Sequence, residues 1–304
     1  MKKKLLVFLT SLVLTLLLLG GCIILVSYYM SKPEDEYSIN SFIQIKNEKE
    51  ALVSSCLELS DCLNESDRVE LEINAGANEE RNVKYELCFF VEYEQVPFFM
   101  EGREYTSYCF ENSAQFTIQI EKKYFCMENN SFVVLLRQDV DRYAESSKLV
   151  RDTPPVILRY DLMQNGGKTK RKKDESLDIT DELVDNMDDV IHIENQTGKE
   201  VTSCHIEKAG KLRLNALLGS TMREGEYTIF ACFNSQQTMI NGKKKMSVQK
   251  KQEGKLDLEI SVPEQTGKYE FQLFFVPSPY EKISDQNFSE YNILASQKQT
   301  VYVE

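Results

Sequence analysis

Hydrophobic and polar residues alternate along much of the chain with the period of two that is typical of β-strands. In residues 255–262, KLDLEISV, every second side chain is apolar, which predicts a strand with one buried face. Runs such as TIFACF (228–233) and YEFQLFFV (269–276) are rich in aromatic and β-branched residues. Asn241-Gly242 predicts a two-residue hairpin turn, because both residues tolerate a positive φ. Strands at this spacing, with no long amphipathic helix between them, favour an all-β fold of antiparallel sandwiches.

The amino terminus departs from this pattern. No charged residue occurs in residues 5–30, a run long enough to cross a bilayer as a helix. Lysines at positions 2–4 precede the run and acidic residues at 34–36 follow it. The positive-inside rule then predicts an anchor at 1–30 in the cell membrane, a single pass, with residues 31–304 extracellular.

A second interpretation of the same run is a lipoprotein signal. Leu19-Gly20-Gly21-Cys22 resembles the bacterial lipobox, which implies cleavage after residue 21 and a lipid on Cys22. The apolar run continues past Cys22, so its length favours an uncleaved anchor. Both interpretations place the rest of the chain outside the cytoplasm.

The body of the chain contains an internal repeat. FIQIKNEKEALVSSC (42–56) aligns without a gap with VIHIENQTGKEVTSC (190–204), and six of the fifteen positions are identical. LEINA (71–75) matches LRLNA (212–216), and Gly102 matches Gly242. A period this long indicates two tandem domains.

These matches define the expected domain organisation. A stalk (31–41) leads to repeat 1 (42–161), a charged linker (162–189) and repeat 2 (190–304). The linker lacks an apolar stripe long enough to join the repeats, so we expect each to fold alone and their relative orientation to vary.

One motif links the second repeat to a known superfamily. Glu264-x-x-Gly267-x-Tyr269-x-Phe271 resembles the start of strand F in immunoglobulin-like domains, where the tyrosine forms a tyrosine corner. Phe271 stands where antibody domains have cysteine, and the chain has no Trp. The resemblance implies two immunoglobulin-like sandwiches. The whole chain also loosely resembles bacterial surface proteins that carry an amino-terminal anchor and tandem sandwich modules.

The repeat predicts a disulfide pattern, which an oxidising exterior would permit. Cys56 aligns with Cys204, and Cys88 and Cys232 lie in matching strands. The predicted bridges are therefore Cys56–Cys88 and Cys204–Cys232. Cys109 and Cys126 are candidates for a third bridge. Cys62 would be left over, either as a free thiol or paired between chains. The alternative is that all of these are buried thiols.

Motifs that carry chemistry are scarce. The histidines, His192 and His205, lie in predicted strands, and no nucleophile, metal or phosphate-binding motif occurs. The linker aspartates 185, 188 and 189 lack the spacing of a calcium loop. We therefore expect no cofactor, no metal site and no catalytic residue.

Charge and location complete the prediction. A net charge of −12 argues against nucleic acid as a partner. The predicted function is binding or scaffolding at the cell surface, with an extracellular protein or surface polymer as partner. The alternative is a surface hydrolase or its accessory subunit, which two carboxylates facing each other in a deep cleft would favour.

Overall fold

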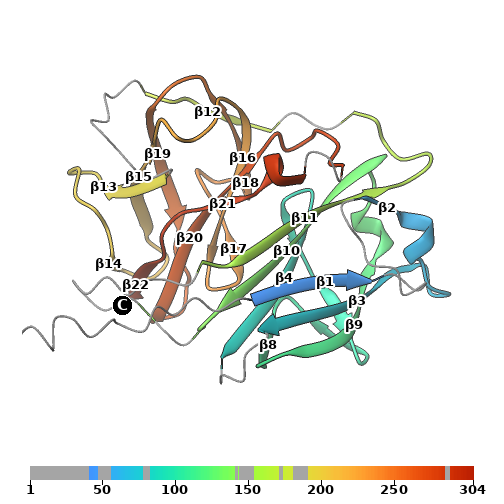
Figure 1. Cartoon of the computed structure of the whole chain (residues 1–304). Helices are drawn as coiled ribbons and strands as arrows, with labels where there is room; N and C mark the ends of the chain where they lie inside the picture. The colour runs from blue at the N-terminus through green and yellow to red at the C-terminus, as the bar shows by residue number, and fades with distance from the viewer. Residues whose placement is uncertain are drawn as a thin grey trace, which may run out of the picture. The chain divides into compact units, whose positions relative to one another are not determined.

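The computed structural model describes residues 41–46, 56–77, 83–140, 143, 154–170, 174–180, 191–284 and 288–304. Within these ranges the chain forms strands β1 to β22 and three short 3-10 helices, so the predicted all-β class is confirmed. By backbone contacts, Ile39–Glu304 is one compact unit. In Figure 1 the strands up to β11 run from blue to green, and those from β13 on run from yellow to red.

Repeat 1 consists of two facing sheets. The first has the order β1 (Ser41–Lys46), β3 (Arg68–Ala77), β9 (Ala114–Glu121), β6 (Phe98–Met100), β7 (Arg103–Tyr105). The second has the order β2 (Cys56–Glu58), β11 (Val156–Met163), β10 (Asn129–Gln138), β4 (Lys84–Val91), β5 (Glu94–Val96), and β8 (Tyr108–Glu111) also pairs with β4. The 3-10 helices are η1 (Leu59–Cys62) and η2 (Lys122–Tyr124).

Repeat 2 repeats this plan. The third sheet has the order β12 (Ser176–Leu177), β18 (Lys245–Lys250), β16 (Gly225–Phe233), β20 (Gly267–Pro277), β22 (Gln299–Val303), β14 (Ser203–Ile206). Short strands β17 (Gln236–Thr238) and β21 (Leu294–Ala295) pair with β16 and β20. The fourth sheet is β13 (Ile191–Asn195), β15 (Lys211–Leu218), β19 (Gly254–Ser261), and η3 spans Phe288–Tyr291.

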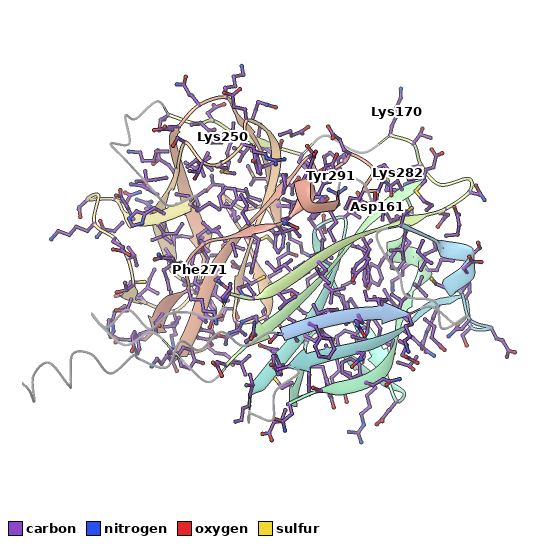
Figure 2. The ribbon with its side chains drawn as sticks, viewed as in Figure 1. Asp161, Lys170, Lys250, Phe271, Lys282 and Tyr291 are labelled. Atoms are coloured by element: carbon purple, nitrogen blue, oxygen red, sulfur yellow. The ribbon has the colours of Figure 1, made fainter. Side chains whose placement is uncertain are left out.

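Each repeat has its own core between its two sheets. In β19 the buried positions alternate as the sequence predicts, because Leu256, Leu258 and Ile260 point into the second core. Phe271, labelled in Figure 2, lies in the same core. In repeat 1, Phe89 of β4 stacks on Phe132 of β10 with ring centroids 5.7 Å apart. The apolar alternation therefore closes each sandwich.

The two repeats share their connections as well as their sequence. An edge strand pairs in parallel with the last long strand in both, β2 with β11 and β14 with β22. The matching hairpin turns also agree: φ is 51° and 76° at Glu101 and Gly102, and 49° and 78° at Asn241 and Gly242. The hairpin predicted from Asn241-Gly242 is confirmed.

Some parts of the prediction need correction, and other parts concern residues that the structure does not describe. Part of the charged linker is ordered, since β12 pairs in parallel with β18. The sheets are therefore not purely antiparallel. The anchor at 1–30, with Cys22, and the stalk to residue 40 lie outside the described residues. The described part of the chain includes no helix of the length and apolarity that a membrane span requires.

Candidate functional site

The two cysteine pairs predicted from the repeat lie on equivalent strands, and in both pairs the two cysteines are far apart. Cys56 in β2 and Cys88 in β4 are separated by β11 and β10, and Cys204 in β14 and Cys232 in β16 by β22 and β20. Three strand spacings amount to roughly 14 Å, whereas bridged Cα atoms lie within about 7 Å. The structure therefore brings neither pair together, and all four are free thiols.

The two cysteines of the third candidate bridge also lie far apart, because they are level with opposite ends of β10. Cys109 lies opposite Glu86, which pairs with Arg137 near the end of β10. Cys126 precedes Asn129, where β10 begins. Eight residues of strand separate these levels, roughly 26 Å. Cys109 and Cys126 are exposed thiols, and Cys62 is a buried thiol of the first core.

Tyr269 has the geometry of a tyrosine corner. Its hydroxyl donates a hydrogen bond to the Gln265 carbonyl, four residues upstream, at 3.0 Å. Tyr227 in β16 makes the same bond to the Arg223 carbonyl at 2.9 Å. The sequence motif indicated the first of these bonds. Gly225-x-Tyr227 shares the Gly-x-Tyr part of that motif and could have indicated the second.

The histidines and aspartates do not assemble a reactive centre. His192 lies in β13 and His205 in β14, on different sheets. His205 stacks on Tyr302, with centroids 4.6 Å apart, and its Nδ1 lies 2.6 Å from Glu304 Oε1. Residues 185, 188 and 189 lie outside the described residues, and within the described ranges no three His, Cys, Asp or Glu side chains cluster as metal ligands would.

A third apolar cluster joins the two repeats. The rings of Phe90 and Phe230 lie 4.8 Å apart, and Phe230 stacks on Phe274 at 5.0 Å. We call this cluster the inter-repeat layer; its buried members are Cys88, Phe90, Tyr93, Val133, Leu135, Phe230, Cys232, Phe274 and Val276. The second and third sheets therefore pack on each other through their outward faces.

This layer corrects the expectation that the repeats vary in orientation. That expectation considered only the linker, whereas the joining residues, apart from Tyr93, lie on the strands β4, β10, β16 and β20. Their sequences carried a signal, since ELCFFV and TIFACF are apolar on successive residues. Such runs are typical of strands buried on both faces.

Reciprocal hydrogen bonds surround the apolar contacts. The Gln95 amide N–H donates to Gln237 Oε1 at 2.8 Å, and the Gln237 amide N–H donates to Gln95 Oε1 at 2.7 Å. The Nε2 of Gln95 donates to the Ser235 carbonyl, and the Nε2 of Gln237 donates to the Tyr93 carbonyl. Each repeat thus makes the same two hydrogen bonds to the other, as the subunits of a two-fold symmetric dimer do.

Buried charges flank one side of the inter-repeat layer. Arg137 of β10 is 1% exposed and pairs with Glu270 of β20 at 2.9 Å. Its Nη1 also contacts Glu86, and Lys298 lies 3.4 Å from Glu270 Oε2. The nearby carboxylates hold the pKa of Arg137 above its usual value, against the opposing effect of burial. The guanidinium therefore stays charged where water is excluded.

A second polar group ties the segment after β20 to repeat 1. Arg159 of β11 donates to the carbonyls of Ser278 and Glu281, at 3.0 and 2.6 Å. The Ile283 amide donates to Asp161 Oδ2 at 2.8 Å. Figure 2 labels Asp161 together with Lys282 and Tyr291 of this segment. The bonds fix the segment against β11.

The environment of the inter-repeat thiols makes them unreactive. Burial raises the pKa of Cys88 well above its ordinary value, and it does the same for Cys232. The thiolate is the reactive form of cysteine, so these two groups pack as small apolar residues.

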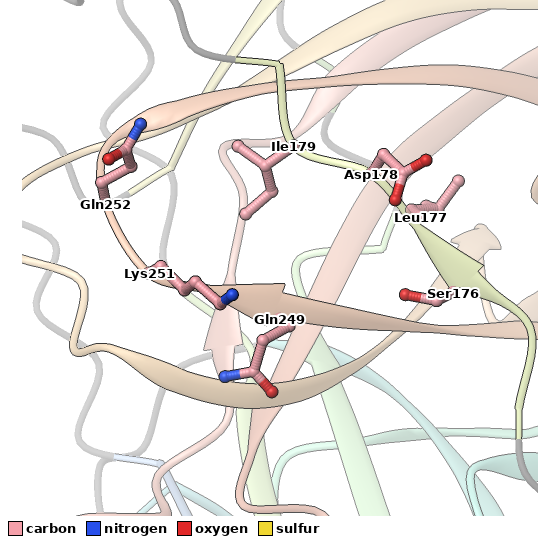
Figure 3. Close-up of a pocket in the computed structure, with 7 residues that line it drawn as sticks. All are labelled: Ser176, Leu177, Asp178, Ile179, Gln249, Lys251 and Gln252. Carbon is pink, nitrogen blue, oxygen red and sulfur yellow. The ribbon is translucent and has the colours of Figure 1, made fainter.

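A pocket of about 390 Å³ lies where the linker meets the end of β18. Figure 3 shows its lining: Ser176, Leu177, Asp178, Ile179, Gln249, Lys251 and Gln252. Asp178 is the single carboxylate among these residues. The pocket thus lacks the facing carboxylates that would favour a glycoside hydrolase. Its polar side chains can form hydrogen bonds, and its two aliphatic side chains can form apolar contacts.

Comparison with protein families and with curated proteins gave no match. Among solved structures, red sea bream transglutaminase matches with a TM-score of 0.23 and 8% identity, over 87% of this chain and 31% of that chain. The C-terminal domain of the Streptococcus agalactiae antigen I/II polypeptide BspA matches with a TM-score of 0.24 and 7% identity, over 86% of this chain and 100% of that chain. The corresponding domain of Streptococcus pyogenes AspA gives 0.24 and 7%, over 87% and 99%.

Proposed function

We propose that the chain is a membrane-anchored extracellular protein that binds or scaffolds through two tandem immunoglobulin-like sandwiches. The observation that carries this proposal is the inter-repeat layer, which joins two all-β domains into one compact unit. Such a unit holds its surfaces at a constant separation, which favours a platform or spacer. The apolar run at 5–30 supports the membrane anchor.

The faces left for a partner are polar. On the first sheet Gln44, Gln115 and Thr117 are exposed, and on the fourth sheet Lys211 and Arg213 are exposed. Hydrogen bonding and charge would therefore dominate recognition there, as at the polar rim of protein interfaces.

The extracellular location can be tested with native thiols. We expect a membrane-impermeant maleimide to label Cys109 and Cys126 of the full chain in intact cells, because both are exposed. The matched control carries Cys109→Ser and Cys126→Ser and should lose the label. Labelling that occurs only after lysis would contradict the proposed topology.

The binding role needs a second measurement. A photo-crosslinking residue at Thr117 or at Arg213 places a probe on either outer face of the full chain in cells. We expect a higher-mass adduct with a surface component from at least one position. A lack of adducts from both positions would contradict binding through these faces.

A further inference from the structure

Residues 174–180, DESLDIT, form a segment that we call the strap. It lies along the edge of the third sheet, where Ser176 and Leu177 pair in parallel with Ser247 and Val248 of β18. The Ser247 amide donates to the Glu175 carbonyl at 2.8 Å. Main-chain bonds of this kind are how a sheet edge captures an extended peptide.

The strap ends in a second set of main-chain bonds. The Thr180 amide donates to the Lys255 carbonyl at 3.0 Å, and the Lys255 amide donates back to the Thr180 carbonyl at 3.0 Å. Thr180 Oγ1 also donates to the Lys255 carbonyl, at 3.1 Å. The strap is therefore held at both ends by repeat 2.

Opposite charges align the acidic end of the strap with β18. Glu175 lies 3.3 Å from Lys243, and Asp174 lies 3.7 Å from Lys245. The Tyr280 hydroxyl donates to Asp174 Oδ2. Lys245 and Asp174 are both mostly buried, so salt screens this pair less than the exposed one.

Two aliphatic side chains fix the register of the strap. Leu177 and Ile179 pack against the second core at alternate positions. The chain leaves room for them at Gly254, where a Cβ would lie 2.2 Å from Ile179 Cγ2 and 2.8 Å from the Thr180 carbonyl oxygen. The pocket beside the strap adds space next to these side chains (Figure 3).

The fold itself does not require this extra strand. In repeat 1 the equivalent strand β8 pairs with β4 as β18 pairs with β16, and no described strand covers the outer edge of β8. Among the described residues the sandwich of repeat 1 closes without a strap, so the contacts at β18 are an addition to the plan that the repeats share.

We propose that the β18 edge of repeat 2 is a docking surface for an extended acidic peptide with aliphatic residues at two alternate positions, which the strap occupies in cis. The proposal rests on the binding role proposed above, for which it names a surface and a class of partner. A tethered segment competes at an effective concentration of about 1 mM, so a partner present at micromolar concentration gains access only when the strap is released.

The test measures binding of a fluorescent peptide, Ac-DESLDIT-amide, to the full chain by anisotropy. Leu177→Ser with Ile179→Ser weakens the strap and leaves β18 unchanged. We expect this variant to bind the peptide at least tenfold more tightly than the parent chain does. Equal affinity for both chains, or no binding to a variant that keeps the parent's thermal transition, would overturn the proposal.

A charge exchange tests the specificity of the surface. Lys243→Glu, added to the strap variant, should lower affinity about fivefold, the size of an exposed ion pair. On the Lys243→Glu chain, a peptide with Lys in place of Glu175 should recover most of this lost affinity. On the chain that keeps Lys243, the same peptide should bind more weakly than the unchanged peptide does. Equal binding of both peptides to both chains would also overturn the proposal.

A variant outside the strap keeps the proposal testable if the double substitution unfolds. Gly254→Ala in the parent chain should displace Ile179 and Thr180 and raise hydrogen exchange at the Ser247 and Lys255 amides, which the strap protects. Unchanged exchange would contradict strap docking. The maleimide experiment is independent of these results, so the extracellular role can stand if strap docking fails.

Discussion

Arg137 is 1% exposed, and the two carboxylates that pair with it come from different repeats. Glu86 comes from its own repeat and Glu270 from the other. Removing one partner from a buried ion pair leaves an uncompensated charge, which costs more than the pair contributes. At the scale of residues, this side chain makes pairing of the two repeats specific.

We therefore expect Arg137→Met to lower the free energy of unfolding by about 3–5 kcal/mol, because Glu270 and Glu86 lose their shared cation. Urea denaturation of the full chain at pH 7 measures this loss. Arg68→Met is the matched control, since Arg68 is only half-buried and lies over the Phe99 ring. A loss no larger than the control's would contradict the role assigned to Arg137.

Cys204 gives a pH dependence at the same scale. Burial raises its pKa from 9.0 to about 11, so the folded chain keeps a proton that the unfolded chain releases. Its contribution to stability is complete below about pH 9 and is lost as the pH rises toward 11.

At pH 8 the thiolate fraction of Cys204 should be about a hundredfold lower than in the unfolded chain. Mass spectrometry of alkylated peptides should then show slow labelling of Cys204 in the native chain and fast labelling in urea. In a Cys204→Ala chain, unfolding free energy should fall less steeply between pH 9 and 11. Equal slopes for the two chains would contradict the shifted titration.

Among the elements, those set by local chemistry could be predicted from sequence. The Asn241-Gly242 turn follows from the backbone freedom of two residues, and the alternation in β19 follows from one buried face. The inter-repeat layer could not be predicted from local sequence. A strand that is apolar on both faces is expected to be buried on both, but its sequence does not indicate which other surface packs against it. The strap was missed because its acidic residues are typical of a solvated linker.

The alignment of the repeats shows another limit of the sequence. The alignment of residues 42–56 with residues 190–204 equates Ile45 with Ile193, and these two residues pair with Ile73 and Ala216. The LEINA match instead equates Ala75 with Ala216. The two differ by two residues, which preserves the buried face of a strand and so leaves the hydrophobic pattern unchanged.

Two glycines at the ends of strands allow a matched test. Gly76 in β3 has φ +140°, and a Cβ there would lie 2.5 Å from the Asn112 carbonyl oxygen. Gly102 has φ +76° with nothing within 4 Å of its Cβ position. Gly102→Ala should cost about 1–2 kcal/mol for its backbone alone, and Gly76→Ala at least about 3 kcal/mol, since steric overlap adds to strain. Similar thermal shifts for both variants would contradict the close approach at Gly76.

At the scale of the whole molecule, the inter-repeat layer predicts that the two repeats stay associated after the linker is cut. A protease site placed within residues 181–190 of the full chain allows cleavage after folding. We expect the cleaved halves to elute together in size-exclusion chromatography, because separation would expose the rings of Phe90, Phe230 and Phe274. Phe230→Asp in the same cleavable chain should release them. Separation of the parent halves would contradict a stable layer.

The reciprocal contacts also make the order of the copies matter. In the strand ladders Arg137 lies opposite Glu86 as Val276 lies opposite Thr228. The Glu92 backbone amide donates to the Ser131 carbonyl as the Asn234 backbone amide does to the Glu270 carbonyl. The counterpart of Arg137 is therefore Val276, and that of Glu270 is Ser131.

A chain built from two first copies would set each arginine against a serine, and one built from two second copies would set each glutamate against a valine. Neither arrangement offers the buried ion the opposite charge that the other copy now supplies, so Arg137 would keep only Glu86 and Glu270 would keep only Lys298. The duplicated halves have thus become complementary, so that a recombination event joining like to like would yield a chain whose two halves associate less tightly.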